Sequence, residues 1–276
     1  MTASLAVLFT IAGIAIGSFI NVCIDRLPSG KSLIHLPSHC DSCQHRINMM
    51  DLIPLLSYIW LRGRCRHCHT RIPLRNPLVE LLSGGLFFLA FWRFILSSEP
   101  HNYPALAITA FWCCVFLVIM FIDWEHKLIL NKMTYPLAVV ALVILGIDSI
   151  TPGSSILGNL AFIPPTSILS GIIAGVIGIT FFLIIFLINP RGMGMGDVKL
   201  AGLIGLVTGL PLVTVALLIG IIIGGLAAIV MLSLRLKGRK DVIPYGTFLA
   251  MGPIITLFWG LDIFHWYQNL FGFFLI

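Results

Sequence analysis

Long apolar runs recur along most of this chain, and they constrain its fold more than any other feature. The runs cover approximately residues 4–24, 78–97, 105–122, 134–149, 167–189, 198–209, 211–233 and 246–273. A helix of about 20 apolar residues crosses the roughly 30 Å hydrocarbon core of a bilayer. With 58% apolar and 10% charged residues, the composition is outside the range of water-soluble domains. The sequence therefore predicts an all-α polytopic membrane protein with about eight transmembrane helices, or seven if the short run at 198–209 does not span.

The first run is expected to remain in the protein as a transmembrane helix over residues 1–24. Residues 1–5 contain no Lys or Arg, and the run is longer than the apolar region of a typical secretory signal. The remaining runs then form a second membrane region, residues 78–276, and a polar segment at 25–77 separates the two.

The positive charges predict how the chain is oriented in the membrane. All but one gather in alternate connections: Arg26, Lys31, Arg46, Arg62, Arg64, Arg66, Arg71 and Arg75; Lys127 and Lys132; Arg191 and Lys199; Arg235, Lys237, Arg239 and Lys240. The exception is Arg93, near the outer end of the second run, whose long side chain can reach the headgroups. The connections near 99–104, 148–165 and 209–211 contain no Lys or Arg. The positive-inside rule places the basic connections in the cytoplasm and the N-terminus outside. Because the net charge of +6 is dispersed over these loops, we expect lipid headgroups as partners and no nucleic acid.

Segment 25–77 contains two C-x-x-C pairs, which predict a metal site. The pairs are Cys40 with Cys43 and Cys65 with Cys68. Four thiolates at such a spacing suit tetrahedral zinc, which would stabilise a loop too small to build much core. A pair of disulfides is the alternative, but a cytoplasmic loop is kept reduced. A redox role is a further alternative, although no βαβ pattern surrounds either pair.

Other potential ligands and thiols are assigned no chemistry. Three histidines near the pairs, His45, His67 and His69, are interpreted as ordinary loop residues because the cysteine set is complete without them. Cys23, Cys113 and Cys114 lie within apolar runs and are expected to be buried and unreactive.

Two aspartates at the ends of apolar runs are the candidate catalytic residues. Asp123 follows the apolar residues 116–122, and Asp197 follows the glycine-rich residues 192–196. Ionisable residues at membrane depth are costly and are therefore functional candidates. The predicted topology brings both to the cytoplasmic face, where a carboxylate pair sharing one proton provides the base and the acid of an aspartic protease. Gly192, Gly194 and Gly196 would allow a substrate backbone to approach.

Each aspartate also has a structural interpretation. Asp197 before Val198 fits a helix cap, whereas Asp123 fits this role less well because the helix dipole disfavours an anion at a C-terminus. Lys199 either biases the ionisation of the pair or faces the headgroups. Glu125 and His126 are alternative acid–base residues, but a solvated turn is the simpler interpretation.

Motifs along nearly the whole chain resemble those of the type IV prepilin peptidases. They are Gly17-Ser-Phe-Ile-Asn-Val22, Arg26-Leu-Pro28, the two cysteine pairs, Arg75-Asn-Pro-Leu-Val-Glu80, Asp123-Trp-Glu-His-Lys-Leu128, Met133-Thr-Tyr-Pro-Leu137, Gly194-Met-Gly-Asp-Val-Lys-Leu200 and Ile243-Pro-Tyr-Gly246. The chain departs from the family at Leu130-Asn131, where members usually carry Pro-Asp. This departure changes a turn and casts little doubt on the aspartate pair.

The resemblance implies a membrane aspartic endopeptidase of the bacterial inner membrane. It implies that Asp123 and Asp197 are the catalytic acids and that the four cysteines bind zinc. It also implies cleavage of type IV prepilins or pseudopilins at the cytoplasmic boundary, followed by N-methylation with S-adenosylmethionine as methyl donor. For the methyltransferase, Glu80 and Arg75 are candidates, and a headgroup-level ion pair between them is the structural alternative.

Two other classes of protein compete with this interpretation. One is an ion- or proton-coupled transporter with a zinc-stapled loop, in which the aspartates bind the coupling ion. Inverted repeats would support it, and the sequence has no convincing repeat. The other is a pilus or secretion subunit that has lost its activity, against which the intact pair of acids argues. The sequence indicates no oligomeric state.

Overall fold

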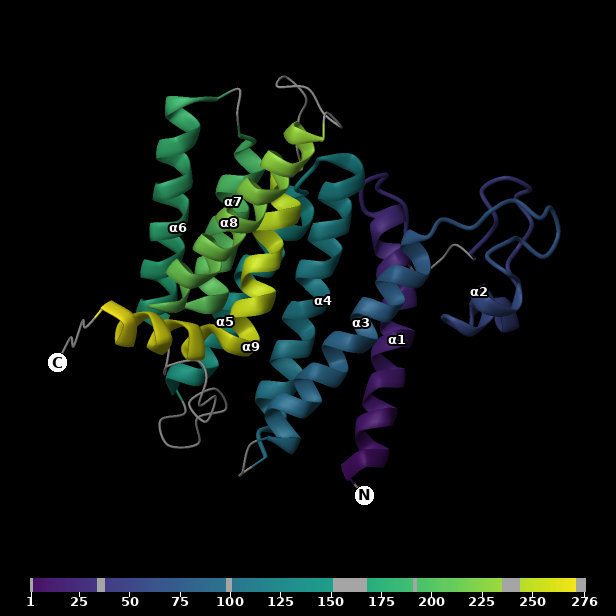
Figure 1. Ribbon diagram of the computed structural model, residues 1–276, viewed down its shortest axis with the longest axis horizontal. Helices are drawn as coiled ribbons and strands as arrows, with labels where there is room; N and C mark the ends of the chain where they lie inside the picture. The colour runs from purple at the N-terminus through teal and green to yellow at the C-terminus, as the bar shows by residue number, and fades with distance from the viewer. Residues whose placement is uncertain are drawn as a thin grey trace. The chain divides into compact units, whose positions relative to one another are not determined.

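The computed structural model describes residues 2–33, 38–97, 101–150, 168–190, 193–234 and 244–271. Nearly all of its regular structure is helical: α1 (Thr2–Arg26), η1 (Met49–Leu52), α2 (Leu56–Trp60), α3 (Arg75–Phe91), η2 (Trp92–Leu96), α4 (Tyr103–His126), α5 (Asn131–Ile150), α6 (Ile168–Ile188), α7 (Met195–Thr208), α8 (Leu212–Ser233) and α9 (Tyr245–Phe271) (Figure 1). Extended pairing in the described ranges is limited to two isolated bridges. The all-α prediction is therefore confirmed.

Several predicted features lie outside the described residues. They are Gly192, the cation Arg191, the basic residues Arg235, Lys237, Arg239 and Lys240, Ile243 of the last motif, and residues 151–165 of the connection predicted near 148–165. The chain divides into two compact units, Met1–Val118 and Ile119–Ile276. The boundary falls within α4, so that the last turns of this helix belong to the second unit.

Helices α1 and α3 pack against each other in the first unit (Figure 1). Small residues allow this approach, as is common between membrane helices. A Cβ atom on Gly13 would lie 2.6 Å from the Cβ of Phe87, and one on Gly17 would lie 2.7 Å from the Cα of Glu80. The cysteine segment connects the end of α1 to the start of α3. It therefore lies at the end of this helix pair where Glu80 is located.

Helix α7 is the centre of the second unit, because it contacts α5, α6, α8 and α9. Its contact with α6 depends on glycine on both sides. A Cβ atom on Gly205 would collide with the carbonyl oxygen of Ala174, and one on Gly178 would lie 2.5 Å from that of Ala201. Most side chains of α7 are buried. This central position fixes Asp197, which lies in its first turn.

Seven helices in the described ranges are long and apolar enough to cross a membrane. They are Ala3–Arg26, Arg75–Leu96, Tyr103–His126, Asn131–Ser149, Ile168–Ile188, Leu212–Ser233 and Tyr245–Leu270. The eighth predicted run, 198–209, corresponds to α7, whose 14 residues extend about 21 Å. Because this length is less than the roughly 30 Å hydrocarbon core, eight spans are not confirmed.

Candidate active site and metal centre

Asp123 lies in the last turn of α4 and is 5% exposed. Its Oδ2 accepts two hydrogen bonds from Thr247, at the start of α9. The backbone N–H donates at 2.6 Å and the side-chain hydroxyl at 3.0 Å. The same hydroxyl lies 3.2 Å from the carbonyl oxygen of Met120. Thr247 therefore orients one oxygen of the Asp123 carboxylate and does not bind the other.

Asp197 lies in the first turn of α7 and is 7% exposed. Its Oδ2 accepts a hydrogen bond from the backbone N–H of Gly194 at 3.2 Å. A carboxylate that reaches back to the first free amide of its helix stabilises the helix start. Asp197 thus makes a capping contact at the start of α7. The sequence placed Asp197 before the helix, but α7 begins at Met195 and includes it.

Two glycines bring the segments beside the aspartates together around Ile129. A Cβ atom on Gly196 would lie 2.9 Å from the Cβ of Ile129. A Cβ atom on Gly246 would lie 2.9 Å from the Cδ1 of Ile129 and 3.1 Å from the Cγ of Asp123. The starts of α7 and α9 therefore both pack on Ile129. Asp123 and Asp197 thus lie beside segments that contact the same side chain, and two carboxylates must be close together to share a proton.

Polar residues near the aspartates have identifiable contacts or exposure. Lys199 donates a hydrogen bond to the Oδ1 of Asn131 at 2.8 Å and lies 5.3 Å from the centre of the Tyr135 ring. It is thus held between α7 and α5. Glu125 and His126 are exposed at the end of α4, in agreement with a solvated turn.

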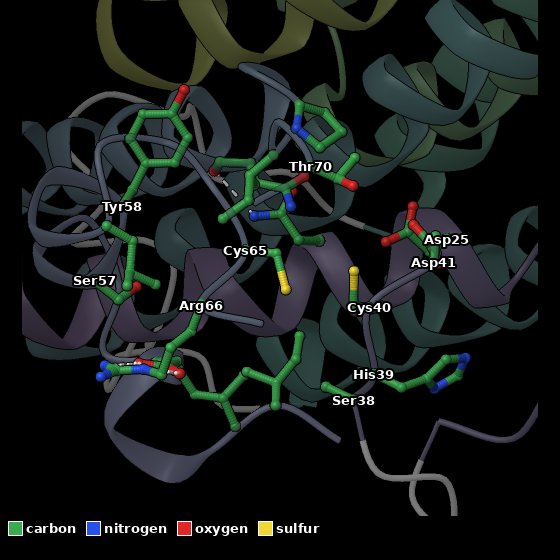
Figure 2. Close-up of a pocket in the computed structure, with 18 of the residues that line it drawn as sticks. Asp25, Ser38, His39, Cys40, Asp41, Ser57, Tyr58, Cys65, Arg66 and Thr70 are labelled. Atoms are coloured by element: carbon green, nitrogen blue, oxygen red, sulfur yellow. Dashed lines mark hydrogen bonds and ion pairs between the residues drawn. The ribbon is translucent and has the colours of Figure 1, made fainter. Parts of the chain in front are cut away.

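The two C-x-x-C pairs converge into one cluster in the first unit. The Sγ atoms of Cys40, Cys43, Cys65 and Cys68 all lie within 4.8 Å of one another. Cys40 and Cys68 are 3.7 Å apart, and sulfurs around tetrahedral zinc are separated by about 3.8 Å. Figure 2 shows Cys40 and Cys65 near each other. All seven cysteines of the chain are free thiols, and the cluster fits a metal ion.

The two halves of the cluster repeat the same backbone structure. In each half, the first cysteine donates its N–H to a carbonyl oxygen five residues on: Cys40 to His45 at 3.0 Å, and Cys65 to Thr70 at 2.9 Å. The residue after the second cysteine has a positive φ, 57° at Gln44 and 55° at His69. Each half is closed by one isolated bridge, His39 to Arg46 and Arg64 to Arg71. The two knuckles are therefore built on the same pattern of backbone hydrogen bonds.

Charged and polar neighbours support the second knuckle. Arg66 forms an ion pair with Asp51 at 2.5 Å, which lowers the pKa of that carboxyl and ties the knuckle to η1. Hydrogen bonds with the side chain and backbone of Thr70 lower the pKa of the Cys68 thiol to about 6. A thiolate is the form that binds zinc. The ring centres of His45 and His67 lie 3.7 Å apart with the rings tilted by 41°, and neither histidine belongs to the cysteine cluster.

Two contacts in the structure were not predicted from the sequence. Thr247 follows the motif that ends at Gly246, and its position in the sequence gave no sign that it binds Asp123. The ion pair considered between Arg75 and Glu80 does not form, because Arg75 binds Asp25 at 2.7 Å. Glu80 instead accepts the backbone N–H of Leu55 at 2.8 Å.

Comparisons with known proteins agree with the resemblance seen in the motifs. Residues 11–94 match the bacterial peptidase A24 N-terminal domain, and residues 110–229 match the type IV leader peptidase family. The chain is similar to the prepilin leader peptidase/N-methyltransferase of Aeromonas salmonicida, at 31% identity over 96% of this chain and 94% of the relative. It is also similar to the proteins of that name from Pseudomonas putida, at 28% identity over 96% and 94%, and Neisseria gonorrhoeae, at 30% over 91% and 87%. No solved structure matches the chain significantly.

Proposed function

Because the chain belongs to the type IV leader peptidase family, we propose that it is a membrane aspartic endopeptidase that removes the leader of type IV prepilins or pseudopilins. The observation that carries this proposal is the pair of buried carboxylates, Asp123 and Asp197, whose flanking segments pack on Ile129. The matched family models and named relatives are peptidases. They favour this function over an ion- or proton-coupled transporter.

The aspartate pair would cleave the peptide without a covalent intermediate. One ionised carboxylate accepts a proton from a water molecule as this water attacks the scissile carbonyl carbon. The other carboxyl is protonated, donates a hydrogen bond to the carbonyl oxygen, and returns a proton to the leaving amine. Thr247 supports this chemistry because it fixes Oδ2 of Asp123. The glycine contacts of Gly196 and Gly246 bring backbone close to the two acids.

Charge-neutralising variants test the catalytic pair. Asp123→Asn and Asp197→Asn should each abolish cleavage of a prepilin by the purified protein, whereas Glu125→Gln should cleave at the wild-type rate. Glu125 is a matched control because it lies two residues from Asp123 and is exposed. Normal processing by either asparagine variant would refute the assignment.

The second proposed activity is N-methylation of the new N-terminus with S-adenosylmethionine as methyl donor. It is supported by the names of the relatives, which are prepilin leader peptidase/N-methyltransferases. Mass spectrometry of cleaved pilin after incubation with S-adenosylmethionine should find one added methyl group on the N-terminal amine. An unmodified amine in fully cleaved product would contradict this activity.

We also propose zinc as the metal of the four-cysteine cluster. The separation of the sulfurs and the chemistry of the donor set support zinc, for which four thiolates form a closed structural site. Bound zinc would join the two knuckles and hold the segment between α1 and α3. Metal analysis should find about one zinc per chain. Protein that is active but contains no zinc would argue against the site.

The chain is a multi-pass inner-membrane protein, in agreement with its seven apolar helices and its relatives. Its proposed orientation places the N-terminus in the periplasm, and the cysteine segment and both aspartates on the cytoplasmic side. The distribution of Lys and Arg supports this orientation. We propose the lipid bilayer and a prepilin or pseudopilin as partners, and no nucleic acid. A membrane-impermeant thiol reagent applied to sealed cells should leave the cluster cysteines unlabelled. Labelling of these cysteines would contradict the proposed orientation.

A further inference from the structure

We infer that Glu80 is the anionic contact for the sulfonium of S-adenosylmethionine, bound in a cavity between the cysteine segment and the adjoining ends of α1 and α3. This inference rests on the methyltransferase activity proposed above. It names one side chain of the first unit as a contact for the methyl donor.

The cavity has a volume of about 490 Å³, which is within the range of sites for small molecules and cofactors. Its wall on one side consists of the cysteine segment, including Cys40, Tyr58 and Cys65 (Figure 2). On the other side it is lined by polar residues of α1 and α3, among them Asn21 and Glu80. Such a mixture of polar and aromatic groups suits a ligand with a charged centre and a planar ring.

Glu80 is a carboxylate in an unusual position at this cavity. It lies in the second turn of α3 and is only 8% exposed, since Gly17 of α1 packs directly against its backbone. Its Oε2 accepts the N–H of Leu55 at 2.8 Å, and the side chain of Ser18 also forms a hydrogen bond with the carboxylate. Neither salt bridge in the described part of the chain involves Glu80. A buried carboxylate without a cation is costly, and a positively charged ligand would stabilise its ionised form.

Asn21 is a second polar group at the same cavity whose hydrogen bonding is incomplete. It is 6% exposed, and its Nδ2 donates to the carbonyl oxygen of Asn76 at 3.0 Å. Its Oδ1 is buried and accepts no hydrogen bond among the described residues. Buried acceptors are nearly always satisfied in native proteins, by the protein, water or a ligand. Asn21 therefore adds a polar side chain to the wall that contains Glu80, and the carboxylate of Glu80 is the anionic group of this wall.

S-adenosylmethionine carries the required charge at the sulfur that bears the transferred methyl group. Its product, S-adenosylhomocysteine, has nearly the same shape but a neutral sulfur. A carboxylate that recognises the sulfonium therefore distinguishes the two ligands by charge. A side chain that only holds the loop in place through Leu55 would not distinguish between the two ligands.

The test measures binding of both ligands to the full chain in nanodiscs by isothermal titration calorimetry. Glu80→Gln is the decisive variant, because its amide oxygen still accepts the N–H of Leu55 while the charge is lost. We expect it to weaken S-adenosylmethionine binding at least about tenfold and S-adenosylhomocysteine binding less than about twofold. Glu80→Asp should retain the wild-type preference between the ligands, and Glu125→Gln should bind both ligands normally. Zinc content and leader cleavage report whether each variant is folded.

The possible outcomes separate this inference from the function on which it rests. If wild-type protein neither binds S-adenosylmethionine nor methylates a cleaved pilin, the methyltransferase function itself fails. If wild-type protein methylates and Glu80→Gln binds S-adenosylmethionine equally well, only the role of Glu80 is overturned. Equal weakening of both ligands, with or without loss of zinc, would show a structural role and would also overturn it.

Discussion

The hydroxyl of Thr247 provides a sharp test of how the candidate active site is held. Replacement by valine keeps the shape of the side chain and the backbone N–H that lies 2.6 Å from Oδ2 of Asp123. It removes only the hydroxyl donor at 3.0 Å. Thr247→Val therefore isolates one hydrogen bond to one oxygen of the proposed catalytic residue Asp123, in a position that is 3% exposed.

The size of the effect follows from the kind of hydrogen bond that is lost. A hydrogen bond to a charged group contributes about 1.5–3 kcal/mol, and about 1.4 kcal/mol corresponds to a tenfold change in rate. The hydroxyl has one proton, and the carbonyl oxygen of Met120 at 3.2 Å competes for it. We therefore expect the lower end of the range, a decrease in kcat/KM of about tenfold.

The assay is cleavage of a prepilin by purified variants in nanodiscs, followed by gel or mass spectrometry at substrate concentrations below KM. Thr247→Ser is the matched control, because it retains the hydroxyl and loses only a methyl group; its kcat/KM should stay within about threefold of wild type. If Thr247→Val cleaves as fast as Thr247→Ser, then the hydroxyl does not orient Asp123 and the reasoning fails.

Three further variants test other parts of the structure. Gly246→Ala should lower the rate of prepilin cleavage at least about tenfold, because its Cβ atom would lie 3.1 Å from the Cγ of Asp123. The control Gly225→Ala, whose Cβ atom would have nothing within 4 Å, should cleave at the wild-type rate. Equal rates for the two variants would contradict the close packing of Gly246 on Asp123. Cys65→Ser should lose bound zinc in metal analysis while Cys114→Ser, outside the cluster, retains it, and zinc retained by Cys65→Ser would exclude this ligand set. Asn131→Asp should convert the hydrogen bond with Lys199 into an exposed ion pair and raise the melting temperature by up to about 3 °C. This increase should disappear in high salt, which screens the charges. An unchanged melting temperature in low salt would argue against the contact between residue 131 and Lys199.

The sequence was most informative where a local pattern determines the structure. Apolar runs of sufficient length predict membrane helices because the backbone must satisfy its own hydrogen bonds in lipid. Two C-x-x-C pairs predicted a four-cysteine cluster because each knuckle is a local turn. The start of α7 was placed too late, since the apolar pattern begins at Val198 while the helix starts at Met195. A glycine-rich start has too little apolar character to reveal a helix.

Contacts between residues far apart in the chain could not be predicted from local sequence patterns. Thr247 and Asp123 are separated by most of the second unit, and only folding brings the start of α9 to the end of α4. Glu80 and Arg75 are five residues apart on one helix, which suggested an ion pair. A spacing of three or four residues, rather than five, aligns side chains on a helix. The longer reach of Arg75 to Asp25 of α1 therefore satisfies the cation and leaves Glu80 to face the cavity. The absence of that ion pair is what makes Glu80 a candidate for binding a cation from outside the chain.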